Sequence, residues 1–383
     1  MALIWLIAGE PSGDAIGVRL MAALSERAPG IRFAGVGGPM MRAGGVRSLF
    51  PFEDLALMGL VEVLPRLRQI RRHLLEAATD IAEKRPDVVV SIDSPGFTLR
   101  LLRRIRPLGI PRAHYVAPQV WAWRESRVRH FPGLWERLLC LLPFEPAFFA
   151  RHGLAASFVG HPVLESGVDR GDPGRFRARH GIAAETPILI VMPGSRAGEV
   201  ARHGAIFGAA FRLLGARHQG LRPVVPAAPA VRNMLPDLLA DWPEAPIIIE
   251  NDDEKPDAYA AAAAALCKSG TSALELALGR VPMVIAYRLN PITSLIARHL
   301  VTVQHASLVN LLAGREVVPE FLQERCTPER LAAALATLLG DPREAAAQRA
   351  AFVPVLASLG PPSGTPSEAA ARAVLDLMGT IPH

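Results

Sequence analysis

Residues 2–27 read ALIWLIAGEPSGDAIGVRLMAALSER, and this stretch decides the fold class. It consists of an apolar run at 2–8, a turn that carries Gly and Ser, and an amphipathic stretch at 14–28. This succession is typical of the strand–helix units that build parallel sheets. The apolar run is shorter than the roughly 18 residues of a membrane-spanning helix. Because no basic residues precede it, it predicts a strand rather than a signal peptide.

The alternation of strand and helix patterns continues along the chain in two series. The first series of expected strands is 2–8, 31–35, 87–92, 112–116, 137–142 and 156–159, and the second is 187–192, 222–226, 246–250, 263–267 and 282–286. The polar residues 165–177, rich in Gly, Asp and Pro, separate the two series. We therefore predict an α/β protein with two Rossmann-like, doubly wound domains whose ligand crevices open at the carboxyl ends of the strands and face one cleft.

The expected domains are residues 1–165, residues 166–350, and C-terminal helices at 351–383 that pack back on the first lobe or on a partner subunit. Ser367 is expected to cap the last helix. Cys140, Cys267 and Cys326 are isolated, and neither they nor the histidines have the spacing of a metal site, so we expect no metal and no disulfide framework.

Lysine and arginine total 42 against 36 acidic residues, and all but Lys84, Lys255 and Lys268 are arginine. Arginine codons are favoured by GC-rich genomes, but the guanidinium fork also suits phosphate. No basic stretch is interleaved with aromatic residues and no nucleic-acid motif is present, so we expect no nucleic-acid partner. A nucleotide-sugar or a membrane surface remains as the anionic partner.

Polar residues follow three expected strands of the first series. Glu10 and Ser12 lie in a turn that opens a helix, where free N–H groups could hold an anion or simply close a tight turn. Asp93 follows the apolar run at 87–92. Its carboxylate could act as a general base or cap the next helix. Gln119 and Trp123 lie in the aromatic segment 114–124. This segment could line a substrate pocket, or its aromatic residues could simply pack in the interior.

Two turns of the second series are suited to phosphate. Arg196 is the last residue of the sequence Pro-Gly-Ser-Arg, which follows the strand at 187–192. It could bind a diphosphate, or it could be a surface residue of a capping turn. Ser269, Gly270 and Thr271 follow the strand at 263–267 and open a helix. Glu275 lies one turn inside that helix, where its carboxylate could accept ribose hydroxyls or complete a capping box with Ser272.

Together and in this order, the motifs resemble those of the lipid A disaccharide synthases, bacterial glycosyltransferases with the two-lobed GT-B fold. The matching pieces are AGEPSGD, GVGGPMM, LALMGLVEVL, IDSPGF, HYVAPQVWAWR, LPFE, FVGHP, MPGSRAGEV, KSGTSALE and NLLAGREVVPEFLQ, spanning residues 8–323. The resemblance implies an inverting transfer from UDP-2,3-diacylglucosamine to 2,3-diacylglucosamine 1-phosphate (lipid X). It gives a β(1→6) disaccharide and UDP, without a cofactor.

The resemblance also implies roles for individual residues. Asp93 is the expected base, Arg196 is expected at the UDP diphosphate, and Asn310 is expected at the cleft. Ser269, Gly270, Thr271 and Glu275 are expected around phosphate and ribose. From their places in turns that follow strands, Glu10, Ser12, Gln119 and Trp123 are expected as further substrate contacts. The acceptor would bind the first domain and the donor the second. Gly96, Thr98 and Val309 stand where the family usually has Asp, Asn and Pro, which puts acceptor positioning in doubt.

The same resemblance implies peripheral association with the cytoplasmic face of the inner membrane, and it allows a homodimer. The apolar residues 55–64, followed by Arg66, Arg68, Arg71 and Arg72, would form the membrane surface, unless they are a buried segment and a solvated helix. Two other interpretations share the fold or the ligand. One is a UDP-N-acetylglucosamine 2-epimerase or an undecaprenyl-type glycosyltransferase, and the other is a nucleotide-sugar-binding protein without turnover.

Overall fold

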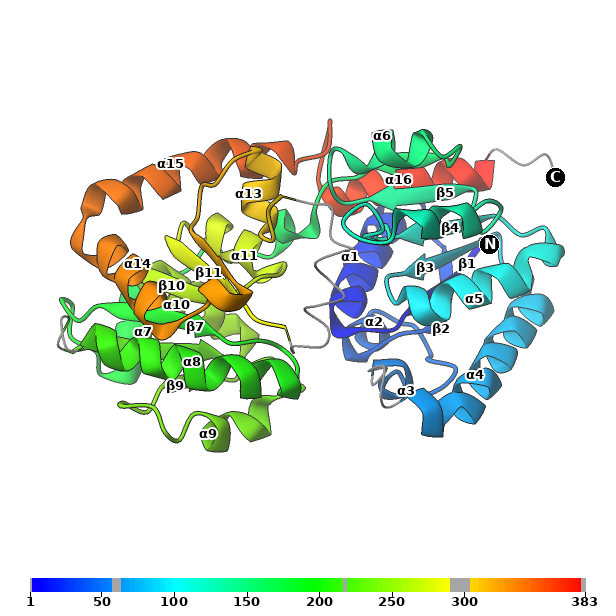
Figure 1. Ribbon diagram of the computed structural model, residues 1–383. Coiled ribbons are helices and arrows are strands. Elements are labelled where there is room, and N and C mark those ends of the chain that lie inside the picture. The colour runs from blue at the N-terminus through cyan, green and yellow to red at the C-terminus, as the bar shows by residue number, and fades with distance from the viewer. Residues whose placement is uncertain (1, 57–62, 216–217, 219, 290–303, 380–383) are drawn as a thin grey trace. The chain divides into compact units, whose positions relative to one another are not determined.

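The computed structural model describes residues 2–56, 63–215, 218, 220–289 and 304–379, and the chain divides into two compact units (Figure 1). The first unit comprises Met1–Pro162 and Leu359–His383, and the second comprises Val163–Ser358. Residues 165–177, expected as the crossing between domains, lie in the second unit. None of the helices in the described part of the chain has the length and hydropathy that a membrane-spanning helix needs.

The first unit is built on a six-stranded sheet in which every pairing is parallel, in the order β2-β1-β3-β4-β5-β6. Its strands are β1 (Leu3–Ala8), β2 (Arg32–Val36), β3 (Val88–Ile92), β4 (Arg112–Tyr115), β5 (Arg137–Cys140) and β6 (Ala156–Phe158). All five residues of β3 are buried. A near-continuous apolar strand of this kind is what a parallel sheet covered on both faces requires.

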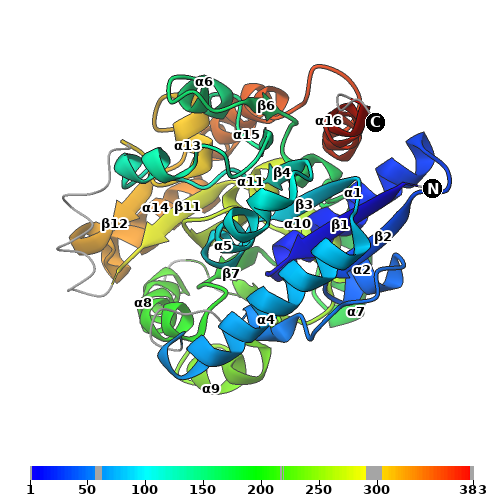
Figure 2. The same cartoon turned by 90° about the vertical axis from the view of Figure 1, so that its right-hand side faces the viewer.

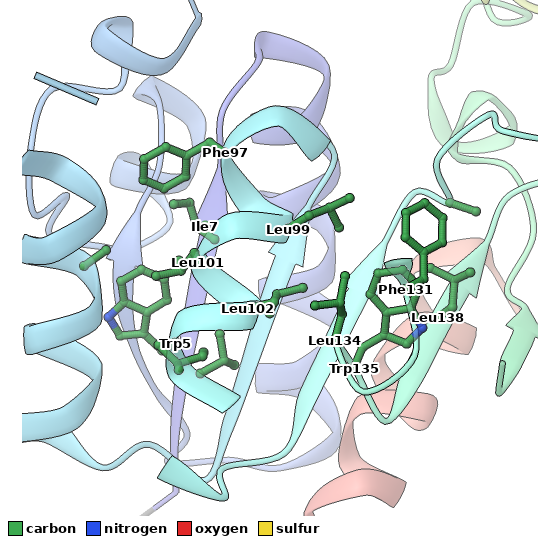
Figure 3. Packing of buried hydrophobic residues seen from close by; sticks show 14 of the residues in the cluster. Trp5, Ile7, Phe97, Leu99, Leu101, Leu102, Phe131, Leu134, Trp135 and Leu138 are labelled. Atoms are coloured by element: carbon green, nitrogen blue, oxygen red, sulfur yellow. The ribbon is translucent and has the colours of Figure 1, made fainter. Parts of the chain in front are cut away.

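Alternate residues of β1 enter two different cores, because successive side chains of a strand point to opposite faces. Trp5 and Ile7 belong to the cluster under α4 (Val63–Lys84) and α5 (Pro95–Ile105), where Figure 3 shows them beside Phe97 and Leu101. Ile4, Leu6 and Ala8 belong to the cluster under α1, α2 and α16. Figure 2 shows α4 and α5 along one face of the sheet.

The opposite face is covered by α1 (Pro11–Arg27), α2 (Pro39–Ala43) and the C-terminal helix α16 (Pro366–Gly379), which packs against α1. Thr365 caps α16, and not Ser367 as the sequence suggested. The Thr365 N–H donates to Glu368, whose own N–H donates to the Thr365 hydroxyl, at 2.8 and 3.3 Å. This reciprocal pair is a capping box, and it places Ser367 inside the helix.

The second unit has its own six-stranded sheet, with every pairing parallel and the order β12-β11-β10-β7-β8-β9. Its strands are β7 (Ile188–Met192), β8 (Arg222–Pro226), β9 (Ile247–Ile249), β10 (Ala264–Lys268), β11 (Met283–Tyr287) and β12 (Glu320–Leu322). The helices α8 (Ala197–Gly215) and α14 (Pro328–Gly340) pack together over one apolar cluster of this sheet.

In the described part of the second unit, the remaining helices are α7 (Pro173–His180), α9 (Leu235–Leu238), α10 (Lys255–Ala261), α11 (Ser272–Leu278), α13 (Leu308–Ala313) and α15 (Pro342–Ser358). Those of the first unit are α3 (Glu53–Ala56) and α6 (Glu145–Ala150). Short 3-10 helices lie at Arg106–Leu108, Glu125–His130, Pro162–Glu165, Arg232–Met234, Asp252–Glu254 and Gln323–Arg325.

The predicted fold class, two doubly wound parallel sheets, is confirmed. Each of the eleven apolar runs expected as a strand overlaps one. The edge strand β12 was not expected, because only three residues of the segment 310–323 pair with β11.

Candidate functional site

The loops that follow β1 and β3 meet at the carboxyl edge of the first sheet. These strands are parallel neighbours, so both loops emerge at the same edge. Gly9 lies so close to Ser94 that a Cβ on Gly9 would stand 2.5 Å from the Ser94 hydroxyl oxygen. Beside this contact, Glu10 is half-buried and Ser12 is exposed. The structure therefore brings Glu10 and Ser12 to the edge of the sheet that also carries Asp93.

Asp14, the last residue of the AGEPSGD piece, joins two of the sequence motifs. Its buried carboxylate accepts hydrogen bonds from the N–H groups of Gly38, Met40 and Met41 at 2.8, 2.9 and 3.0 Å. A charge buried in this way is stable only when hydrogen bonds satisfy it. Asp14 thus fixes the GVGGPMM turn against the first turn, a function that sequence analysis did not assign.

Asp93 lies at a point of the first unit where neighbouring residues have strained backbone. Asp93 and Ser94 have φ values of 53° and 47°, and Val116, at the end of the neighbouring strand β4, has a φ of 75°. A positive φ at a β-branched residue is an outlier, and such residues cluster at functional sites. The Asp93 N–H donates to the Tyr115 carbonyl at 2.9 Å, which holds the two strand ends together.

The Asp93 carboxylate contacts the backbone immediately before α5. Its Oδ1 accepts the adjacent Ser94 N–H at 2.8 Å, and Ser94 occupies the N-cap position without a side-chain cap. The buried Thr98 closes the turn, because its hydroxyl contacts the carbonyls of Asp93 and Ser94 at 2.8 and 3.0 Å. Gly96 faces open space, with nothing within 4 Å of where its Cβ would lie. The turn at Asp93 is therefore closed, although Gly96 and Thr98 stand where the family usually has Asp and Asn.

His114 and His161 of the first unit are buried. His114 is fully buried on β4, 2.7 Å from the Ser91 hydroxyl and stacked on Trp135. Burial lowers the pKa of His114 to about 3 and that of His161 to about 4. Both imidazoles are therefore neutral near pH 7, and neither is exposed at the edge where Asp93 lies.

In the second unit, three groups gather around one carboxylate near the end of β7. Glu199, in the first turn of α8, accepts the Ser195 N–H at 3.2 Å and the Lys268 ammonium at 3.0 Å, and the Arg196 guanidinium lies 3.9 Å away. The Arg196 side chain is 73% exposed. Gly194, with a φ of 144°, allows this approach, since a Cβ there would stand 2.5 Å from Glu199 Cβ.

Lys268 is the functional candidate that sequence analysis missed in this unit. Its ammonium lies between the Ser195 turn and Gly270, and 5.5 Å from the centre of the Tyr287 ring. The strands β7 and β10 are adjacent, so the two turns expected to hold phosphate lie side by side. Lys268 ends β10, and this position on a strand next to β7 was the signal that could have identified it.

His203, in α8, joins the Pro-Gly-Ser-Arg turn to the residue that follows β11. Its Nδ1 lies 2.8 Å from the Pro193 carbonyl, and its Nε2 accepts the Arg288 N–H at 3.1 Å. These partners require the proton on Nδ1 and a lone pair on Nε2. Burial, as the largest cause, lowers the pKa of His203, so the neutral form that makes both bonds persists near pH 7.

The Ser-Gly-Thr turn is held from its other side by Ser269, whose hydroxyl donates to the Ala306 carbonyl at 2.6 Å. Thr271 is exposed and precedes α11 without a side-chain cap. Because Thr271, and not Ser272, occupies the N-cap position, the suggested capping box from Ser272 to Glu275 does not form. The Glu275 carboxylate pairs with Lys255 at 3.0 Å. Gly270 and Thr271 thus leave an accessible turn beside Lys268.

Asn310, expected in contact with substrate, is completely buried. Its amide nitrogen donates to the Val318 carbonyl and to Glu320, and its oxygen accepts the N–H groups of Val317 and Val318, all within 2.9 Å. These four bonds use the full capacity of the amide. The side chain of Asn310 therefore organises the 310–320 segment and has no polar group left for a ligand.

Gln119 and Trp123 lie in the loop after β4, at the same edge as Asp93. Gln119 is exposed, Trp123 is 42% exposed, and the Arg124 guanidinium lies 4.7 Å from the centre of the Trp123 indole.

Within the described residues, no three His, Cys, Asp or Glu side chains converge as a metal site would require. The expectation of a metal-independent site stays a prediction.

Comparisons with known proteins agree over nearly the whole chain. A family model described as "Lipid-A-disaccharide synthetase" matches residues 4–373. The chain is 57% identical to a lipid-A-disaccharide synthase of Gluconobacter oxydans over 98% of this chain and 91% of the relative. It is 52% identical to that of Granulibacter bethesdensis over 98% of this chain and 99% of the relative.

Among solved structures, the UDP-GlcNAc 2-epimerase of Neisseria meningitidis bound to UDP-GlcNAc is similar with a TM-score of 0.65 and 13% identity, over 100% of both chains. MurG of Acinetobacter baumannii is similar with a TM-score of 0.55 and 15% identity, again over 100% of both chains. At these identities the likeness is one of fold.

Replacing Lys268 by Met should weaken UDP binding, because it removes one cation from the two turns and leaves Glu199 without its ammonium partner. Hydrogen bonds to charged groups are worth about 1.5–3 kcal/mol, so we expect the Kd for UDP to rise roughly 10- to 100-fold by calorimetry. Lys84→Met, which removes an ammonium paired with Asp80 in the first unit, is the control. An unchanged Kd in Lys268→Met would show that the diphosphate does not bind between these turns.

Proposed function

Because this chain belongs to the lipid-A-disaccharide synthase family, it is a glycosyltransferase of lipid A biosynthesis, and we propose that it joins UDP-2,3-diacylglucosamine to lipid X. The observation that carries this proposal is the family match over residues 4–373. The products would be a β(1→6) disaccharide 1-phosphate and UDP. The epimerase interpretation is supported by fold alone, at 13% identity, against 57% for the synthase of Gluconobacter oxydans.

The second unit would bind the UDP moiety of the donor. Arg196 and Lys268 supply cations there, and the turn at Gly270, which opens α11, would supply N–H groups. Negative charge develops on the leaving diphosphate as the glycosidic bond breaks, and donors placed in advance around that charge stabilise the transition state. Ser269 and Thr271 would contact phosphate. Glu275, already held by Lys255, would accept the ribose hydroxyls.

The first unit would bind the acceptor, with Asp93 as the base. Inversion at the sugar C1 requires the acceptor hydroxyl to attack in line and to lose its proton to a group beside it. Asp93 lies at the carboxyl edge of β3, on a turn in which Asp93 and Ser94 both have positive φ values. Glu10, Ser12, Gln119 and Trp123 lie on loops at the same edge and would contact the acceptor.

Peripheral membrane binding is part of the same proposal, since both substrates carry acyl chains. Most of the proposed surface, residues 55–64, lies outside the described residues. The described part of α4 carries Arg68, Arg71 and Arg72, all exposed. Such a basic helix favours an anionic bilayer. The homodimer stays a prediction.

The assay that tests the function uses radiolabelled lipid X with UDP-2,3-diacylglucosamine in detergent. We expect a labelled disaccharide and stoichiometric UDP. We also expect no product when UDP-N-acetylglucosamine replaces the acylated donor, and unchanged activity after exhaustive EDTA treatment. Turnover of UDP-N-acetylglucosamine alone would support the epimerase interpretation and contradict the proposal.

Asp93→Asn should lower kcat by about 10²–10⁴-fold, the usual contribution of a positioned base, because the amide keeps the size of the side chain but takes no proton. The Kd for UDP and the Tm should change little. Asp87→Asn, at the amino end of the same strand, is the matched control and should retain turnover. Turnover near that of the wild type in Asp93→Asn would remove Asp93 from the catalytic role.

Sedimentation with vesicles tests membrane binding. We expect the protein to bind anionic vesicles at low salt and to dissociate at high salt, since surface electrostatic attraction is screened by salt. Arg68→Glu combined with Arg72→Glu should weaken that binding. Equal binding to neutral vesicles, or none to either kind, would argue against a basic surface on α4.

A further inference from the structure

The loop that carries Gln119 and Trp123, residues 116–124, has no regular secondary structure of its own; we call it the tryptophan loop. Two local backbone bonds shape it, from Val120 N–H to the Pro118 carbonyl and from Ala122 N–H to the Gln119 carbonyl, at 2.7 and 3.2 Å. The Val116 N–H, which donates to the Leu139 carbonyl at 3.1 Å, ties the first residue of the loop to β5, and Ala117 and Val120 are buried in the apolar cluster of this unit. A further contact holds the middle of the loop.

Glu145 supplies that contact from the start of α6. One carboxylate oxygen, Oε1, accepts the indole N–H of Trp121 at 2.9 Å. The other, Oε2, accepts the N–H groups of Leu141 and Leu142, both at 3.0 Å. The Phe144 ring meets the Trp121 indole edge to face, with 4.9 Å between centroids. The carboxylate thus ties the middle of the tryptophan loop to the backbone that follows β5.

This arrangement requires a carboxylate. Glu145 is only 2% exposed. Burial raises its pKa to about 7, although its three hydrogen bonds favour the charged form and lower the pKa. All three partners are donors, so both oxygens must accept. A glutamine would turn its NH₂ group either toward the indole N–H or toward the two backbone N–H groups. An apolar residue would leave all three donors buried without a partner, at the cost of their desolvation.

We propose that Glu145 is a positioning residue for the acceptor: through Trp121 it holds the tryptophan loop so that Gln119 and Trp123 face the substrate at the edge that carries Asp93. The proposal rests on the proposed function, which assigns the acceptor to the first unit. Glu145 itself touches no reacting atom. It acts by fixing the loop, so its loss affects acceptor binding and leaves the donor site unchanged.

The test is a double-mutant cycle of Glu145→Gln and Trp121→Phe in the purified full-length enzyme, with KM for each substrate, kcat and Tm measured on the same preparations. Trp121→Phe removes the indole donor and keeps an aromatic ring. Trp135→Phe is the matched control, because Trp135 is a buried indole of the same unit whose N–H has no hydrogen-bond partner in the structure.

We expect each of Glu145→Gln and Trp121→Phe to raise the KM for lipid X about tenfold or more, the order expected for losing a hydrogen bond to a charged group. The double variant should be no worse than the more affected single variant, because both changes break the same bond. The KM for the donor and the Kd for UDP should stay within twofold of the wild type. Trp135→Phe should leave the KM for lipid X unchanged.

A lower Tm with an unchanged KM for lipid X in both single variants would overturn the proposal and leave Glu145 a purely structural residue. Effects that multiply in the double variant would also overturn it. If Glu145→Gln does not fold, the comparison of Trp121→Phe with Trp135→Phe still decides. A wild-type enzyme that does not join the lipid pair would overturn the proposed function itself, which is a result distinct from an active wild type with unaffected variants.

Discussion

Parallel pairing is the constraint on which the organisation of both units depends. Every strand pairing among the described residues is parallel, so within each sheet all the loops that follow strands emerge at one edge. Residues distant in sequence, such as Glu10, Asp93 and Gln119, are thereby brought to the same edge. The cost is visible in the backbone, because Asp93, Ser94 and Val116 must all adopt positive φ values where their strands end.

Buried or half-buried carboxylates stabilise these crowded edges. Turns after strands leave backbone N–H groups without a ladder partner, and a carboxylate with two accepting oxygens can satisfy several of them at once. Four such carboxylates each accept at least one backbone N–H from a neighbouring turn: Asp14, Glu145, Glu199 and Glu320. Acidic residues in the motifs of this chain are therefore often anchors, and their presence in a motif does not make them reactive.

The sequence predicted what depends on local pattern. Apolar runs identified eleven strands, and two turns of Gly, Ser and Thr identified the ends of β7 and β10. It did not predict what depends on partners distant along the chain. Asn310 was expected at the cleft because the resemblance implied it, but its amide is saturated by Val317, Val318 and Glu320. Lys268 was overlooked because its importance comes from Glu199, which lies on another strand–helix unit.

The charges at the second sheet's edge show why Lys268 matters for a leaving diphosphate. Arg196 and Lys268 contribute two positive charges, and Glu199 removes one of them, so the two turns together carry one net positive charge. Burial and the neighbouring cations act in opposite directions on Glu199, and its pKa is lowered, so the carboxylate is ionised near pH 7. The ammonium of Lys268 is therefore what prevents Glu199 from repelling an anion beside Gly270. Arg196, 73% exposed and 3.9 Å from the same carboxylate, is then the cation most available to the phosphates themselves.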